Sequence, residues 1–133
     1  MSVLYLDASA IVKIVIRERE SLALRAELEN WTELASSIVS RVEVARALRR
    51  MMGAAAWSEP DADAVLDGIA YLDIDVTLTR EAARLDPLEL RSLDAIHLAS
   101  AISLAGDLGA ISTYDVRLAE AARQRGIAVL SPS

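Results

Sequence analysis

The sequence predicts a three-layer α/β domain with a mostly parallel central sheet flanked by helices. Short apolar runs of strand length alternate with longer segments of helical periodicity along the whole chain. The length of 133 residues is that of one domain, and a hydrophobic content of 53% is enough for one core. Because no internal repeat and no Pro-, Gly- or Ser-rich linker divides the chain, we expect a single domain over residues 1–133.

Two kinds of pattern predict the elements of the N-terminal half. Val3 to Leu6 is a short apolar run that Asp7 ends, and such a run is typical of a buried strand. Segments with apolar residues at helical spacing follow, and Gly53 is a stop signal after the last of them. The predicted elements are a strand over 3–6, helices over 8–16 and 21–30, a short strand over 33–36 and a helix over 40–52.

The C-terminal half continues the alternation of strands and helices. Pro60 is typical of the first turn of a helix, the segment 72–78 alternates apolar and polar residues as a strand does, and the segment 93–104 is apolar almost all round, as in a buried helix. The predicted elements are a helix from 60 to about 71, a strand over 72–78, a helix from 79 to near 87, a buried helix over 93–104, a strand over 110–113, a helix over 116–125 and a strand over 127–130.

The composition argues against several classes of protein. The formal net charge is −6, whereas a protein that coats nucleic acid nonspecifically would be basic. An acidic chain is still compatible with a nuclease whose carboxylates hold a cation. No apolar run approaches the roughly 20 residues that span a membrane, and the N-terminus lacks the pattern of a secretory signal. Cysteine is absent, which excludes disulfides and thiolate metal sites and fits a cytoplasmic protein.

Four acidic residues are predicted to meet at one edge of the sheet. Asp7 follows the first strand, and Asp115 follows the strand that ends near Thr113. Glu43 and Asp94 are predicted to lie in the first turns of two helices. Because ligands of parallel sheets bind at the carboxyl ends of the strands, we expect these four side chains to gather there.

Each acid also has a structural interpretation. Asp7 and Asp115 could be N-caps of the helices that follow them. Glu43 could form a capping box with Ser40, and Asp94 could complement a helix dipole. Taken singly, each acid fits this interpretation, but together they favour function, because Ser or Asn would cap a helix equally well.

The surroundings of these acids indicate a metal site. Asp94 lies in an apolar helix, where a carboxylate is costly to bury unless it is paired or holds a metal. Converging carboxylates repel one another unless a divalent cation is present, and oxygen-only ligands suit Mg²⁺ or Mn²⁺. Such a cation can activate water and neutralise the charge of a phosphodiester. The sequence leaves open whether one ion or two bind.

Five segments resemble motifs of a known family. They are residues 4–13 (LYLDASAIVK), 40–48 (SRVEVARAL), 93–99 (LDAIHLA), 112–118 (STYDVRL) and 129–132 (VLSP). These segments resemble PIN-domain proteins, most of all the VapC toxins of type II toxin–antitoxin systems, and they span nearly the whole chain in the right order. The resemblance implies a Mg²⁺-dependent endoribonuclease with an RNA substrate, usually a homodimer, and a cognate antitoxin whose tail blocks the acidic site.

The resemblance also assigns roles to single residues. Glu43 would be a further acid that binds metal or positions water. Ser9 and Thr113 match hydroxyl positions near the metal. The metal ligands would be Asp7, Asp94 and Asp115.

Three further features admit more than one interpretation. His97 could face the site, but a buried or partner-bonded histidine is favoured because the proposed metal chemistry needs only oxygen. Arg46 lies one turn past Glu43, where it could pair with that acid, touch a phosphate or remain solvated. Asp73 and Asp75 share one face of a predicted strand and are interpreted as surface charges. Large apolar side chains could pack in the core or form an interface, namely Trp31, Met51, Met52 and Trp57.

Two rival phosphate-handling enzymes fail on single residues. A receiver domain needs a lysine after a late strand, and the only lysine is Lys13. A phosphotransferase with an Asp-x-Asp motif after the first strand fails because Ser9 occupies the second acidic position. The remaining alternative is a non-catalytic PIN-like module that binds RNA or a protein partner without cutting.

Overall fold

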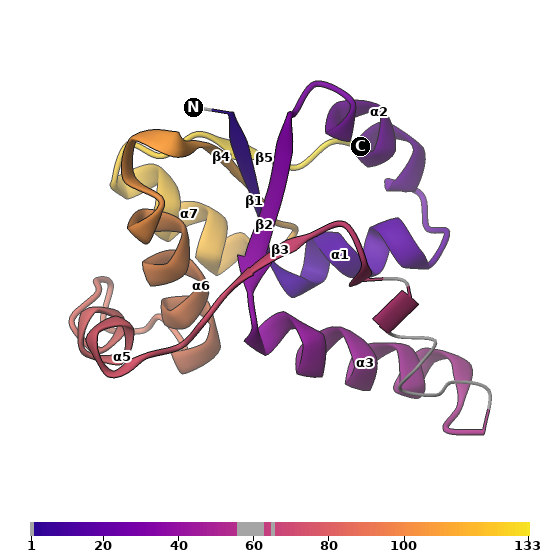
Figure 1. The fold of residues 1–133 in the computed structure, drawn as a ribbon, viewed down its shortest axis with the longest axis horizontal. Coiled ribbons are helices and arrows are strands. Elements are labelled where there is room, and N and C mark those ends of the chain that lie inside the picture. The colour runs from indigo at the N-terminus through magenta and orange to yellow at the C-terminus, as the bar shows by residue number, and fades with distance from the viewer. Residues whose placement is uncertain (1, 56–62, 65) are drawn as a thin grey trace.

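A five-stranded parallel sheet in the order β3-β2-β1-β4-β5 lies at the centre of the fold (Figure 1). The computed structural model describes residues 2–55, 63–64 and 66–133. The sheet confirms the predicted α/β class, and the central position of β1 explains why it is apolar on both faces. The strands are β1 (Val3–Leu6), β2 (Glu33–Ser37), β3 (Ala70–Leu72), β4 (Leu108–Ser112) and β5 (Val129–Leu130).

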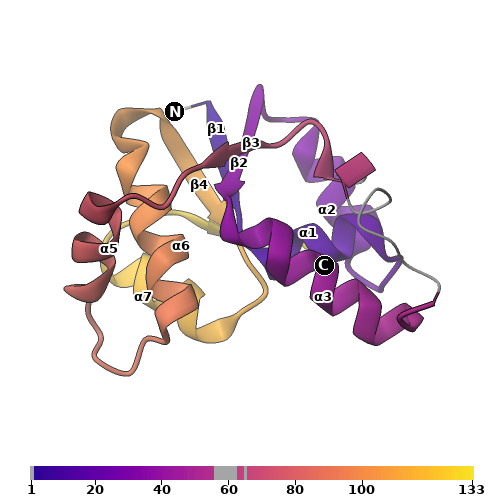
Figure 2. The ribbon, with the colours of Figure 1, turned by 60° about the horizontal axis from the view of Figure 1, so that its bottom comes forward.

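Helices cover both faces of this sheet, as Figures 1 and 2 show. The first three helices lie on one side and the last three on the other, and no described helix is long and apolar enough to cross a membrane. A 3₁₀ turn, η1 (Ala105–Asp107), precedes β4. The helices are α1 (Ala8–Val15), α2 (Ser21–Leu28), α3 (Val39–Met52), α5 (Val76–Ala83), α6 (Ser92–Ser103) and α7 (Val116–Gln124).

Alternation along the central strand divides the core into two layers. Leu4 and Leu6 point to the layer shared with α1, α2 and α3, whereas Tyr5 points to the layer shared with α6 and α7. A smaller apolar cluster joins α5 to α6 through Leu78 and Ala99. The sheet is therefore held from both sides, and the ends of its strands have fixed positions.

The predicted strand over 72–78 is wrong, because the strand β3 ends at Leu72 and α5 begins at Val76. The carboxylate of Asp75 caps α5 by accepting a hydrogen bond from the backbone N–H of Leu78 at 2.8 Å. The alternation in this segment arises from a loop whose Ile74 packs against the cluster between α5 and α6. The two aspartates therefore do not share a strand face.

The large apolar side chains have different environments. Trp31 is half-buried and packs against the first core layer, as the core interpretation predicts. Met51 and Met52 are exposed at the end of α3, so core packing is wrong for them. Trp57 and the helix start predicted at Pro60 lie outside the described residues.

The cap of α5 can be tested by removing it. We expect Asp75→Ala to lower the free energy of unfolding by about 0.5–2 kcal/mol, because the N–H of Leu78 loses its acceptor. The matched control is Asp73→Ala, an exposed acid before the cap, which should change stability by less than about 0.5 kcal/mol. Urea unfolding followed by circular dichroism measures both variants, and equal losses would contradict the assignment of the cap.

Candidate active site

Two of the four predicted acids cap helices that follow strands of the sheet. Asp7 follows β1 and caps α1, with its Oδ1 atom accepting from the backbone N–H of Ala10 at 3.0 Å. Asp115 caps α7, with its Oδ1 atom accepting from the N–H groups of Arg117 and Leu118 at 2.9 and 3.2 Å. The capping interpretation is therefore confirmed for both acids. Each carboxylate has further lone pairs, so capping does not exhaust its capacity to bind.

Asp7 is the most tightly held of the four acids. Its side chain is 4% exposed. The hydroxyl of Ser9 donates to its Oδ1 atom at 2.7 Å, and the hydroxyl of Thr113 donates to its Oδ2 atom at 2.6 Å. The same two hydroxyls accept hydrogen bonds from the backbone N–H groups of Tyr114 and Asp115. The two predicted hydroxyl residues thus tie the loop after β4 to the carboxylate at the end of β1.

Three of the acids act electrostatically on the fourth, Asp94. Burial raises the pKa of Asp7, although the hydrogen bond from Thr113 lowers it. Burial also raises the pKa of Asp94, and the negative charges of Asp115, Asp7 and Glu43 raise it further. Asp94 lies in the first turn of α6, as predicted. The fold therefore brings the other three acids near enough for their charges to act on Asp94.

This arrangement is not a closed metal cage. Within residues 2–55, 63–64 and 66–133, no three His, Cys, Asp or Glu side chains are grouped closely enough to hold a metal ion. The predicted metal ligands thus share an electrostatic environment in the structure. Their joint coordination of a cation stays a prediction.

Glu43 does not form the predicted capping box. Because α3 begins at Val39, Glu43 lies beyond its first turn and cannot reach back to Ser40 as a cap. The hydroxyl of Ser40 instead lies 2.7 Å from that of Ser36. The Oε1 atom of Glu43 lies 2.7 Å from the Nε2 atom of His97.

His97 is buried in the core layer of α6, and its ring has partners on both sides. Its side chain is 2% exposed, and its Nδ1 atom lies 2.7 Å from the hydroxyl oxygen of Tyr5. The predicted buried, partner-bonded histidine is confirmed. The sequence did not identify its acidic partner, although the position of His97 one turn after Asp94 placed it on the right helix.

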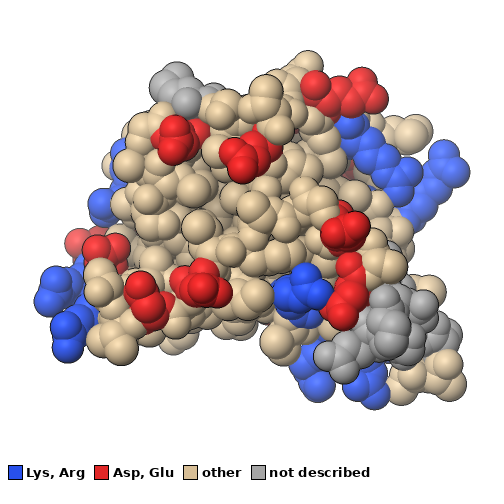
Figure 3. Space-filling view, in the orientation of Figure 1, with Lys and Arg blue, Asp and Glu red and all other residues tan. Residues whose placement is uncertain are grey.

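A groove of about 420 Å³ lies beside these acids. Ser9 of α1, Leu93 of α6, and Glu43, Arg46 and Arg50 of α3 are among its lining residues. In Figure 3, acidic side chains are spread over the visible face, while basic side chains lie mainly along its edges, including the lower edge over α3. One acid and two arginines of the same helix, α3, thus line the groove, and Arg46 is placed to contact an anion in it.

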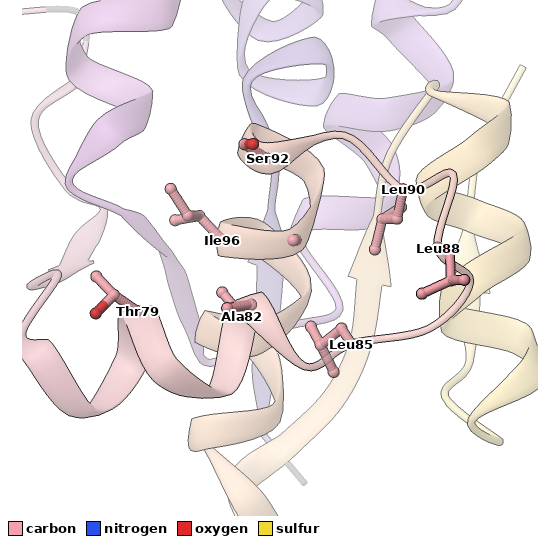
Figure 4. A pocket seen from close by; sticks show the side chains of 9 residues that line it. Thr79, Ala82, Leu85, Leu88, Leu90, Ser92 and Ile96 are labelled. Carbon is pink, nitrogen blue, oxygen red and sulfur yellow. The ribbon is translucent and has the colours of Figure 1, made fainter.

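A second hollow lies between α5 and α6 (Figure 4). The side chains of Leu85, Leu88 and Leu90 come from the loop that joins these helices, and Ile96 comes from α6. None of its lining residues is ionisable. This hollow therefore has no group for acid–base chemistry, and the groove lined by Glu43 and Arg46 is the better candidate for an active site.

The fold and the site define a class of protein, namely α/β domains with a parallel sheet and acidic residues near the carboxyl ends of its strands. A family model described as PIN domain matches residues 4–124. Ribonuclease VapC46 of Mycobacterium tuberculosis is 46% identical over 133 residues, which is 100% of both chains. Ribonuclease VapC35 of the same species is 41% identical and aligns with 97% of this chain and 96% of its own. The chain therefore belongs to the PIN-domain family, in its VapC group.

A solved structure of low sequence identity has the same fold. The sarcin-ricin loop cleaving toxin VapC20 of Mycobacterium tuberculosis superposes with a TM-score of 0.73, covering 97% of this chain and 99% of its own, at 16% identity. This similarity confirms the PIN-like α/β fold.

The hydrogen bonds around Asp7 can be tested by a nearly isosteric substitution. We expect Thr113→Val to lower the free energy of unfolding by about 1–3 kcal/mol, because the buried Oδ2 atom of Asp7 loses its donor. The matched control is Thr77→Val at an exposed position of α5, for which we expect a change below about 0.5 kcal/mol. Urea unfolding measures the difference, and equal midpoints would contradict the role of the hydroxyl.

The repulsion at Asp94 predicts a dependence of stability on pH. The pKa of Asp94 is higher in the folded protein than in the unfolded chain, so the folded protein binds more protons. The free energy of unfolding therefore falls as pH rises from the unfolded pKa of this carboxyl through its folded pKa. We expect Asp94→Asn to unfold at a higher temperature than the wild type at neutral pH. The difference should disappear below about pH 4, where an unfolded aspartate is protonated. Thermal unfolding across this range measures it, and the same difference at every pH would refute the electrostatic cause.

Proposed function

We propose that the chain is a divalent-metal-dependent endoribonuclease and the toxin of a toxin–antitoxin pair. The rim formed by Asp7, Glu43, Asp94 and Asp115 would hydrolyse RNA phosphodiester bonds. The observation that carries this proposal is the coupling at Asp94, whose pKa is raised by burial and then by the charges of the other three acids. Carboxylates whose pKa is raised by burial and by neighbouring charges are typical of functional sites. Full-length relatives that are named ribonucleases support RNA as the substrate.

The chemistry of the donor set fits a hard divalent cation. Asp7, Asp94 and Asp115 would hold it, since they offer only oxygen, which Mg²⁺ prefers and Mn²⁺ also accepts. A cation would also relieve the repulsion that raises the pKa of Asp94. When bound, such an ion acts as a Lewis acid and lowers the pKa of water.

Other side chains of the site would position the acids, accept a proton and bind the substrate. Ser9 and Thr113 hold the carboxylate of Asp7 through hydrogen bonds of 2.7 and 2.6 Å. Glu43 lines the groove and would orient the attacking water and accept its proton. Arg46, on the same wall, would bind a phosphate of the RNA. The protein thus supplies orientation and a proton acceptor at fixed positions.

The partners follow from the proposed role as a toxin. A cognate antitoxin would bind over the acidic groove, the chain would act as a homodimer, and RNA would be met in the cytoplasm. VapC20 is a toxin that cleaves the sarcin-ricin loop, but its 16% identity to this chain supports the fold alone.

Cleavage should depend on Asp94. We expect Asp94→Asn to lower the rate of RNA cleavage in Mg²⁺ by at least about 10²-fold, because the site loses a charge that attracts the cation. The assay follows several classes of structured RNA with Mg²⁺, with Mn²⁺ and with chelator. The matched control is Asp73→Asn, an exposed acid on the loop before α5, which should cleave like the wild type.

A second readout of the same variants separates binding of the cation from catalysis. We expect Mg²⁺ to raise the unfolding temperature of the wild type and of Asp73→Asn, and to raise that of Asp94→Asn less, because a ligand stabilises the state that binds it. RNA binding without Mg²⁺-dependent cleavage by the wild type would refute the enzyme and favour a non-catalytic module.

A further inference from the structure

We propose that His97 is a positioning residue that holds the carboxylate of Glu43 toward the groove, with Tyr5 anchoring its ring. This inference deepens the proposed ribonuclease function, on which it rests. None of the sequence motifs assigned a task to this histidine, and the oxygen-only chemistry of the rim does not use it.

The contact between the two side chains joins a buried group to an accessible one. His97 lies in α6 with its side chain 2% exposed, whereas the side chain of Glu43, in α3, is 23% exposed. The Nε2 atom of His97 lies 2.7 Å from the Oε1 atom of Glu43, across a separation of 54 residues. Glu43 also lines the groove beside the rim acids. The contact with the buried ring therefore holds the Oε1 atom of Glu43, which restricts the rotamers of this side chain.

The hydrogen-bonding partners define which nitrogen of the neutral ring carries the proton. An ionised carboxylate only accepts hydrogen bonds, so the Nε2 atom must donate to Glu43. The Nδ1 atom of the neutral ring then accepts, and the hydroxyl of Tyr5 donates to it at 2.7 Å. A tyrosine hydroxyl carries its proton at neutral pH, so it can act as this donor. All donors thus point in one direction, from Tyr5 through His97 to Glu43.

This chain of hydrogen bonds links the three elements that carry most of the rim. Tyr5 lies in β1, two residues before Asp7, and His97 lies in α6, one turn after Asp94. Glu43 lies in α3. The buried ring therefore couples the position of Glu43 to the strand that precedes Asp7 and the helix that holds Asp94, and such support from behind orients a proton acceptor.

The proton on the ring can be observed directly, because His97 is the only histidine in the chain. We expect ¹⁵N NMR of the imidazole in mildly alkaline solution to show protonated Nε2 and unprotonated Nδ1. In Glu43→Ala the Nε2 resonance should shift, because its acceptor is gone. A proton on Nδ1, or no shift in Glu43→Ala, would overturn the proposed hydrogen bond without any assay of activity.

Kinetics of RNA cleavage test whether this bond serves the reaction. We expect His97→Ala to lower kcat by about 10–100-fold with little change in KM, because Glu43 loses its orientation and the RNA contacts remain. His97→Gln keeps an N–H donor near the position of Nε2 and should recover at least about tenfold of the lost kcat. In a Glu43→Ala background, the change from His97 to Ala should cost no further activity.

A control on the same helix separates positioning from loss of stability. Ile102→Ala removes a half-buried apolar side chain of α6 and should lower the unfolding temperature without lowering kcat. If His97→Ala keeps the kcat of the wild type, or if His97→Gln is as slow as His97→Ala, the positioning role is refuted. A wild-type protein that cleaves no RNA would refute the proposed function and this role with it, while the NMR result would still decide the hydrogen bond.

Discussion

Asp7 lies at the end of the central strand with its side chain 4% exposed, and donors from three residues hold its carboxylate. A buried carboxylate is costly unless it is hydrogen-bonded, so the positions of these donors are not free to vary. Ser9 comes from α1, and Thr113 comes from the loop after β4. The register between β1 and β4 places the two loops side by side, with Leu6 opposite Ser112. The positions of Asp7 and of the loop that leads to Asp115 thus follow from one buried acid and the parallel pairing beside it.

Helix capping and ligand binding make compatible demands on a carboxylate. In both Asp7 and Asp115, the Oδ1 atom accepts the capping hydrogen bonds, which fixes the side chain against the first turn of a helix. A carboxylate has about four acceptor sites, so a capping acid can still bind a cation or orient a water. The structural and functional interpretations of these acids therefore do not exclude each other. Capping supplies the rigidity that a catalytic group needs.

Features determined by local patterns could be predicted from the sequence, and features determined by side-chain packing could not. The strand ends placed Asp7 and Asp115, and apolar periodicity placed Asp94 in a buried helix. The start of α3 at Val39, one residue earlier than predicted, was enough to remove the expected capping box. Pairing of Glu43 with His97 depends on the relative placement of α3 and α6, which lie on different sides of the sheet and are separated by 54 residues at this contact, and no local pattern encodes it. The alternation over 72–78 misled because a capped loop can imitate a strand.

The net charge of −6 would repel RNA, so the proposed substrate must be attracted locally. Glu43, Arg46 and Arg50 line the same groove, and their spacing of three and four residues places them on one face of α3. The acid lies toward the start of the helix and the arginines toward its end. A phosphate bound by an arginine would therefore direct the neighbouring backbone toward the rim acids. The negative charges of the RNA backbone and of the rim acids repel each other. A bound cation would reduce this repulsion, so binding of the cation and binding of RNA would be coupled in the proposed enzyme.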